Sequence, residues 1–163
     1  MSGAAEGQYV TFGLGEEVFA APVGLVREIL TYQAPSRIPN GPAYLLGLTD
    51  VRGRGVPTAD LRIRLGMTPV EPTLNTRILV LDIPLEDHVL SLGLVADRVF
   101  EVAVFAADQI EHAPDLGVKW RSEYISGVVR QSEGFVILIA LARLLSTTDT
   151  ASLTSMTDVD RAA

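Results

Sequence analysis

The chain has 163 residues, of which 48% are hydrophobic and 20% charged, so it is long enough for one globular domain or two small fused ones with a substantial core. Its net charge of -7, together with the lack of a Lys/Arg cluster interleaved with aromatic residues, argues against nucleic acid or anionic membrane as a partner. It has no cysteine, which excludes disulfides, thiolate catalysis and cysteine metal ligands.

The sequence predicts neither a signal peptide nor a membrane-spanning segment. The opening residues, MSGAAEGQ, have neither the basic start nor the apolar run of a signal peptide. The longest apolar run, residues 135–141, is too short to cross a bilayer. We therefore expect a cytoplasmic protein without membrane insertion. We also expect residues 1–7 to be disordered and residues 147–163 to form a flexible tail, because both are rich in small and polar residues.

Short strands and turns are predicted for the N-terminal region. Residues 10–14 alternate between apolar and small or polar side chains, as a half-buried strand does. A turn at residues 15–17 leads to a partner strand at residues 18–21. An apolar segment at residues 25–30 precedes a loop at residues 33–43 that holds three prolines and a glycine.

The next unit, residues 44–65, reads as a tyrosine-bearing apolar turn, a strand, a glycine-containing bend, a second strand and a short helix. Asp60 stands directly before the helix and can cap it, while Gly66 can end it. A polar connector at residues 66–76 follows. We place the boundary between two intertwined subdomains there, within a single domain at residues 8–146.

The second half continues the pattern of strands, turns and a brief helix. Its expected elements are strands at residues 78–83 and 89–95 joined by a turn at 84–87, an irregular stretch at 106–119, a strand at 135–139 and a helix at 140–146. Many short strands with closely spaced turns are typical of an all-β protein, and we expect two barrels of about five strands each. Roughly 70 residues per half is marginal for an independent core, so the barrels should pack on each other.

Much of the 44–65 unit returns eighty residues later without a gap. In addition, residues 26–29 are echoed by residues 99–102. A period this long is not that of a solenoid and indicates two similar subdomains. The matched pairs are Tyr44 and Tyr124, Gly47 and Gly127, Val56 and Val136, Leu61 and Leu141, and Leu65 and Leu145.

The sequence offers no constellation of catalytic or metal-binding residues. Its two histidines, His88 and His112, stand apart from any second ligand at the spacing of a zinc site. The acidic pairs at residues 16–17 and 86–87 lie in expected hairpin turns, where solvation explains them. Residues 52–55, RGRG, lack the lysine and the following helix of a phosphate loop. We therefore expect no catalytic residue, no metal and no cofactor.

Two charged residues and one glycine have two readings each. Glu28 and Arg52 stand in apolar strand sequences, either as outward-facing positions or as an ion pair that meets across neighbouring strands at a recognition surface. Gly47 either permits a close backbone approach or leaves a shallow hollow against which a partner helix can lie.

Three blocks of sequence, in their order and spacing, resemble the CheW family, the coupling proteins of bacterial chemosensory arrays. The resemblance covers residues 9–145 and is carried by YVTFGLGEEVFAAPVGLVREIL at 9–30, SRIPNGPAYLLGLTDVRGRGVPTADLRIRLG at 36–66 and SEYISGVVRQSEGFVILIALARLL at 122–145. It implies two five-stranded, SH3-like barrels on a shared core, with short helices including one near the C-terminus, and an adaptor without enzymatic activity.

The resemblance also implies two partners at receptor arrays beneath the inner membrane. One is the cytoplasmic tip of a chemoreceptor (a methyl-accepting protein), and the other is the regulatory domain of a CheA-like histidine kinase. Leu116 and Glu111 match positions near a kinase interface, although Glu111 stands where the family can have a basic residue. The positions associated with receptor contact are Val26, Glu28, Gly47 and Arg52. We add Val102 as a further residue against which a receptor hairpin would lie.

Three functions are compatible with these observations. The first is a scaffold that links receptor and kinase in chemotaxis. The second is the same coupling task in another chemosensory pathway, such as one for surface motility or development. The third, from a different class, is a small-molecule-binding or catalytic β-barrel, which would need a deep polar pocket with converging titratable groups.

Overall fold

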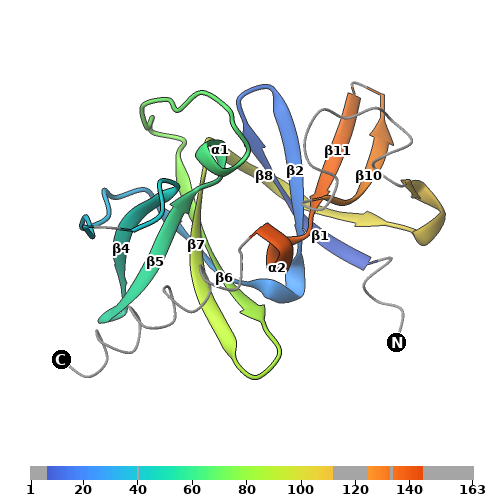
Figure 1. Ribbon diagram of the computed structural model, residues 1–163. Helices are drawn as coiled ribbons and strands as arrows, with labels where there is room; N and C mark the ends of the chain where they lie inside the picture. The colour runs from blue at the N-terminus through green and yellow to red at the C-terminus, as the bar shows by residue number, and fades with distance from the viewer. Residues whose placement is uncertain (1–6, 40, 112–124, 133, 145–163) are drawn as a thin grey trace.

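The computed structural model describes residues 7–39, 41–111, 125–132 and 134–144. The described residues form an all-β fold of two sheets with a few short helices, as expected from the sequence (Figure 1). No helix within these ranges is long and apolar enough to cross a membrane. Of the segment expected to be disordered, residues 1–7, the last residue, Gly7, begins β1, and residues 1–6 lie outside the described residues. The expected tail, residues 147–163, and Leu116 also lie outside them.

The first sheet, which we call barrel 1, contains the five consecutive strands from the middle of the chain, in the order β3-β6-β7-β5-β4. Figure 1 shows β4 and β5 at the left of the molecule. Two polar side chains stabilise the pairing of β4 with β5 from inside, since the hydroxyl oxygens of Thr49 and Thr58 lie 2.6 Å apart. The strands are β3 (Val26–Thr31), β4 (Leu45–Val51), β5 (Arg54–Asp60), β6 (Arg77–Pro84) and β7 (Val89–Ala96).

The second sheet, barrel 2, combines the N-terminal hairpin with strands from the C-terminal part of the chain, in the order β8-β1-β2-β11-β10-β9. It has six strands rather than the expected five, because the two-residue strand β9 forms within a stretch expected to be irregular. The strands are β1 (Gly7–Leu14), β2 (Glu17–Pro22), β8 (Arg98–Phe105), β9 (Ile110–Glu111), β10 (Ile125–Gln131) and β11 (Gly134–Ile139).

Four short helical elements connect the strands. Asp60 caps α1 as predicted, because its carboxylate accepts a hydrogen bond from the Arg62 backbone N–H at 3.0 Å. Gly66, with φ of +78°, lies just beyond the helix in the conformation that glycine favours. The helical elements are η1 (Val23–Leu25), α1 (Leu61–Arg64), η2 (Ala107–Gln109) and α2 (Leu141–Leu144).

The connector at residues 66–76 does not separate the two sheets. It joins β5 and α1 to β6, and all of these strands belong to barrel 1. Each half of the sequence repeat instead gives its first hairpin to the other barrel. Thus β7 pairs in parallel with β5, whereas β2 pairs in parallel with β11. The chain therefore passes from one sheet to the other between β2 and β3 and again between β7 and β8.

A close strand approach makes the β5–β7 ladder possible. Gly93 in β7 pairs with Thr58, and a Cβ at position 93 would lie 2.8 Å from the Thr58 hydroxyl. Only a residue without a side chain fits at that distance. This cross-half pairing depends on a contact between residues far apart in the sequence, which no local pattern predicts.

The core has three parts. The largest cluster lies between the sheets and takes residues from both, including Phe12 and Phe19 of barrel 2 and Leu81 of barrel 1. Leu61 of α1 and Leu141 of α2, a matched pair of the repeat, are both buried in it. Each barrel also has its own smaller cluster. This arrangement confirms the expected pair of barrels on a shared core.

A buried ion pair fastens the two barrels together. The Arg62 side chain in α1 is 5% exposed and binds the carboxylate of Asp97, which is 25% exposed and lies between β7 and β8. One bond, from Arg62 Nη1 to Asp97 Oδ1, is 2.6 Å long. The Gly15 backbone N–H, in the β1–β2 turn, donates to the other carboxylate oxygen of Asp97. Asp97 thus joins the helix of barrel 1 to the hairpin of barrel 2.

Candidate partner-binding surface

Glu28 and Arg52 form the predicted ion pair. Arg52 Nε and Nη2 each lie 3.3 Å from a carboxylate oxygen of Glu28. The geometry corrects one detail of the prediction, because the two residues are not on neighbouring strands. Glu28 lies on β3 and Arg52 follows β4, and these strands are the opposite edges of the barrel 1 sheet. The pair therefore bridges the two edge strands at one end of barrel 1, and we call this end its mouth. The role of the pair in receptor contact stays a prediction.

The backbone of the β4–β5 turn presents Arg52 for this pairing. Val51 pairs with Arg54, which leaves a two-residue loop, and both loop residues have positive φ, +54° at Arg52 and +84° at Gly53. Such loops match the twist of a hairpin. The Asp50 carboxylate accepts a hydrogen bond from the Gly53 N–H at 2.9 Å, which stabilises the turn. Arg52 is held by the fold although its side chain is 81% exposed.

We expect the Glu28–Arg52 pair to contribute little to stability. Glu28 is 19% exposed but Arg52 is mostly in solvent, so the coupling free energy should be below about 1 kcal/mol and should fall as salt is added. A double-mutant cycle with Glu28→Gln and Arg52→Gln, followed by urea denaturation, measures it. Strictly additive effects would show that the two side chains do not act as a pair.

Gly47 is explained by the close approach of the 33–43 loop. Its φ is +148°, and a Cβ there would lie only 1.9 Å from the Ser36 carbonyl oxygen. Ser36 forms two backbone hydrogen bonds with Leu48, each of 2.8 Å. The matched Gly127 is also approached closely, but mainly by a side chain, because a Cβ there would lie 2.6 Å from Ile110 Cγ2 and 3.2 Å from the Glu111 carbonyl oxygen. The structure thus supports the first reading of Gly47, a close backbone approach.

The remaining proposed contact residues differ in exposure. Val26 is partly buried against the central core, whereas Val102 is 52% exposed on β8. Neither these two residues nor Gly47 lines either of the hollows described below. Glu111 on β9 binds Arg130 on β10 in two hydrogen bonds of 3.0 and 3.1 Å, so its charge is already paired.

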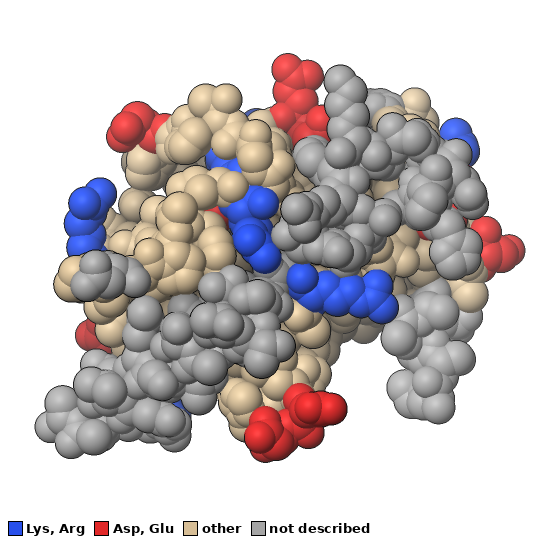
Figure 2. Space-filling model, in the orientation of Figure 1, with Lys and Arg blue, Asp and Glu red and all other residues tan. Residues whose placement is uncertain are grey.

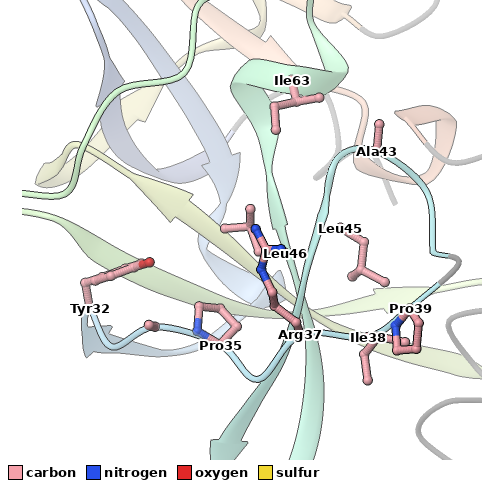
Figure 3. Close-up of a pocket in the computed structure, with 10 residues that line it drawn as sticks. Tyr32, Pro35, Arg37, Ile38, Pro39, Ala43, Leu45, Leu46 and Ile63 are labelled. Atoms are coloured by element: carbon pink, nitrogen blue, oxygen red, sulfur yellow. The ribbon is translucent and has the colours of Figure 1, made fainter.

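The first hollow lies under the 33–43 loop of barrel 1 (Figure 3). Its volume is about 660 Å³, and its apolar lining residues include Pro35, Ile38, Leu45 and Ile63. Arg37 is the charged residue on its lining. A catalytic barrel would need several titratable groups that converge on the pocket, and the lining of this hollow does not provide them.

The second hollow, of about 710 Å³, lies in barrel 2 between β8 and the β10–β11 turn. Phe100 and Phe135 line it, although they are 48% and 41% exposed. Sequence reasoning missed these two residues. A sequence signal was available at Phe100, because it lies within residues 99–102, which echo residues 26–29.

Charged side chains on the face shown in Figure 2 form separate spots, with basic groups in the middle and at the left and upper right margins, and acidic groups near the margins. A phosphate-backbone binder needs a continuous basic surface, which this face does not present within the described residues. The described part of the chain also has no group of three or more His, Cys, Asp or Glu residues placed to hold a metal ion.

Comparison with known proteins assigns this two-barrel fold to a family. A family model described as the CheW-like domain matches residues 8–149. The chain belongs to the CheW family. Its resemblance to CheW, based on three sequence blocks, is therefore confirmed over almost the whole described structure.

Several CheW relatives are similar over most of their length. The chemotaxis protein CheW of Klebsiella aerogenes is 33% identical over 152 residues, which cover 93% of this chain and 89% of that protein. CheW of Treponema pallidum is 30% identical, with 91% and 88% covered. Protein PilI of Pseudomonas aeruginosa is 29% identical, with 78% and 70% covered.

A solved structure shows the same fold. The crystal structure of the scaffolding protein TtCheW from Thermoanaerobacter tengcongensis matches with a TM-score of 0.77, at 24% identity, over 88% of this chain and 95% of that one. At this identity the match shows a shared CheW fold and leaves the partners of this chain to be argued separately.

Proposed function

We propose that this CheW-family chain is a non-catalytic scaffold that couples the cytoplasmic tip of a chemoreceptor to the regulatory domain of a CheA-type histidine kinase. The observation that carries the proposal is the CheW-like domain match over residues 8–149. The names of the Klebsiella and Treponema relatives, both chemotaxis proteins, support it. On this proposal the chain works in the cytoplasm at receptor arrays beneath the inner membrane, without membrane insertion, a cofactor or a reaction of its own.

The receptor contact would be a helix-in-groove interaction. Apolar side chains of a receptor hairpin would pack near Val26, Gly47 and Val102, with the Glu28–Arg52 pair at the rim. The half-buried Glu28 and the exposed Arg52 offer one fixed carboxylate and one accessible guanidinium to that partner. The kinase contact would use the region of Glu111 and Leu116.

The coupling itself requires no covalent change in this chain. A scaffold biases a kinase only if it contacts the active and inactive arrangements of the kinase with different free energies. The rigid junction at Asp97 supports such a role, because it ties the two barrels into one unit that can transmit a change in geometry.

Ternary co-elution tests the proposal. The purified chain, a receptor cytoplasmic fragment and a kinase regulatory domain are mixed and separated by size-exclusion chromatography. All three should elute together, and omission of this chain should separate the receptor from the kinase domain. If the chain binds neither component, the scaffold proposal is wrong.

Val102→Glu is expected to weaken receptor binding by more than about tenfold while leaving kinase binding unchanged. Val102 is 52% exposed, so the substitution leaves the core intact, but an unpaired carboxylate at a receptor interface costs desolvation free energy. Fluorescence titration with each partner measures the two affinities. The control is Val70→Glu, which makes the same change at a residue that is 56% exposed in the connector. Equal receptor affinity in both variants would remove Val102 from the receptor site.

A coupling role in a pathway other than chemotaxis is the second candidate, and the similarity to Protein PilI favours it. The same fold and contact surfaces would serve both pathways. Deletion of the gene in the source organism distinguishes them, because loss of swimming chemotaxis and loss of surface motility or development are different phenotypes.

A further inference from the structure

The mouths of the two barrels are built from matched residues. β3 and β8 are both edge strands, and each pairs with the first strand of the hairpin that its barrel receives from the other half of the repeat. Each strand has a bulge next to a glutamate, Glu28 in β3 and Glu101 in β8. The two glutamates therefore occupy equivalent positions at the two mouths.

The partner of the glutamate differs between the two mouths. In barrel 1, Arg52 in the β4–β5 turn binds Glu28. In barrel 2, the β10–β11 turn has Ser132 at the matched position, directly after the last paired residue, Gln131. Within the described ranges, no Lys or Arg pairs with the Glu101 carboxylate.

The hollow of barrel 2 lies where the ion pair is missing. Both Glu101 and Ser132 line this space of about 710 Å³, and Glu16 adds a second carboxylate. Phe100 and Phe135 supply exposed aromatic surface beside these acids. A site with carboxylates next to aromatic rings suits a guanidinium that is followed or preceded by an apolar side chain.

Two nearby arginines in the described part of the chain are already engaged. Arg130 lies over the Phe135 ring at 5.1 Å and binds Glu111 in two hydrogen bonds. Arg98 lies over the Phe100 ring at 5.7 Å and is close enough to Asp97 to lower the pKa of that carboxyl. Neither arginine is part of the lining of the hollow.

We propose that the barrel 2 hollow docks an arginine-bearing segment of a partner protein. The arginine pairs with Glu101, as Arg52 pairs with Glu28 in barrel 1, and an adjacent apolar side chain packs on Phe100 and Phe135. One barrel thus takes its arginine from its own chain, and the other takes it from a partner. This docking site is additional to the receptor and kinase surfaces proposed above.

The natural probe is the turn that performs this task in barrel 1. A fluorescein-labelled, head-to-tail cyclised peptide with the sequence of residues 49–56, TDVRGRGV, presents the arginine in a hairpin turn. We expect saturable binding to the full chain in fluorescence anisotropy. A second peptide with serine at the position of Arg52, as in the barrel 2 turn, should bind at least about tenfold more weakly.

Reversing the charge of Glu101 tests whether the peptide binds at this residue. Glu101→Arg should weaken binding of the arginine peptide at least about tenfold, and it should increase binding of a peptide with glutamate at the Arg52 position. Glu101 is exposed, so the variant should keep the melting temperature of the parent chain. The control is Glu71→Arg, in the exposed connector, which should change neither affinity.

Two results would overturn the proposal. One is no saturable binding of the arginine peptide to the parent chain. The other is equal binding of that peptide to the parent and to Glu101→Arg, which would place the peptide elsewhere. The assay contains neither receptor nor kinase, so its failure leaves the scaffold proposal standing, and failure of the co-elution experiment leaves this docking site standing.

Discussion

Replacing Asp97 with alanine is expected to destabilise the protein by about 3 kcal/mol, near the lower end of the range for breaking a buried ion pair. The variant leaves the Arg62 guanidinium, only 5% exposed, without its carboxylate. It also removes the acceptor of the Gly15 N–H and so loosens the β1–β2 hairpin from α1. Thermal unfolding should show a melting temperature about 6–12 °C lower.

Asp82→Ala is the matched control for this prediction. Asp82 also binds an arginine, Arg27, with a bond of 3.1 Å, but the two side chains are 38% and 40% exposed. Loss of this surface pair should cost less than about 1 kcal/mol. If the two variants lose equal stability, burial does not determine the cost, and the proposed lock between the barrels is wrong.

The pH dependence of the same variant gives a second readout. Burial alone would raise the pKa of Asp97, but the hydrogen bonds from Arg62 and Gly15 outweigh it and hold the pKa below its usual value. The stabilisation is therefore complete above the unfolded-state pKa of about 3.9 and is lost as the pH falls through the lower folded-state pKa. The stability difference between parent and Asp97→Ala should be constant near neutral pH and shrink in acid.

The pKa of Asp60 is shifted in the opposite direction to that of Asp97. Burial raises the pKa of this carboxyl above its usual value, despite the hydrogen bond from Arg62. A raised folded-state pKa means that the ionised form is destabilising in the native protein and that protonation relieves this cost as the pH falls. As the pH falls into the acid range, the parent chain therefore loses the stabilisation from Asp97 but gains stability from protonation of Asp60.

Gly47→Ala is expected to cost about 3 kcal/mol or more, from two sources. A φ of +148° is strained for any residue with a Cβ, and the new atom would meet the Ser36 carbonyl oxygen at 1.9 Å. Either β4 or the 33–43 loop must move, with loss of the two Ser36–Leu48 hydrogen bonds. Urea denaturation of the purified variant measures the loss.

Two other glycines serve as controls that separate the cost of the positive φ from the cost of the steric overlap. Gly53 also has a positive φ, +84°, but has open space where a Cβ would lie, so Gly53→Ala should cost about 1 kcal/mol. Gly24 has open space and no positive φ, and Gly24→Ala should change stability by less than about 0.5 kcal/mol. If Gly47→Ala were as stable as the parent but failed to bind receptor, Gly47 would instead belong to a partner-facing hollow.

The sequence by itself determined the class of elements and much of their placement. Alternating side chains predicted the strand of residues 10–14, and the turn after it predicted its partner at residues 18–21; β1 is, however, buried on both faces over residues 9–14 rather than half-buried. Asp60 and Gly66 marked the ends of α1. These features depend on neighbours within a few positions, so local chemistry is sufficient to predict them. The repeat also predicted a matched core, since Val56 and Val136 are both buried in the corresponding strands β5 and β11.

The sequence predicted the Glu28–Arg52 pair for a partly correct reason. Each charge stood alone among apolar residues, which suggested a partner, and the structure provides that partner. The two edges of the barrel 1 sheet meet there, however, rather than two neighbouring strands. Charge and composition indicate that a pair is needed, whereas the closure of a barrel decides which residues form it.

Only the tertiary structure decided how the repeat is assembled. Exchange of the hairpins β1–β2 and β6–β7 between barrels rests on parallel ladders such as Thr58 with Gly93, between segments far apart in the chain. Asp97 shows the same limit, because in the sequence it is one polar residue between two strands, but in the fold it meets both α1 and the β1–β2 turn. Side-chain alternation fixes which face of a strand is buried, and the choice of partner strand depends on the packing of the whole molecule.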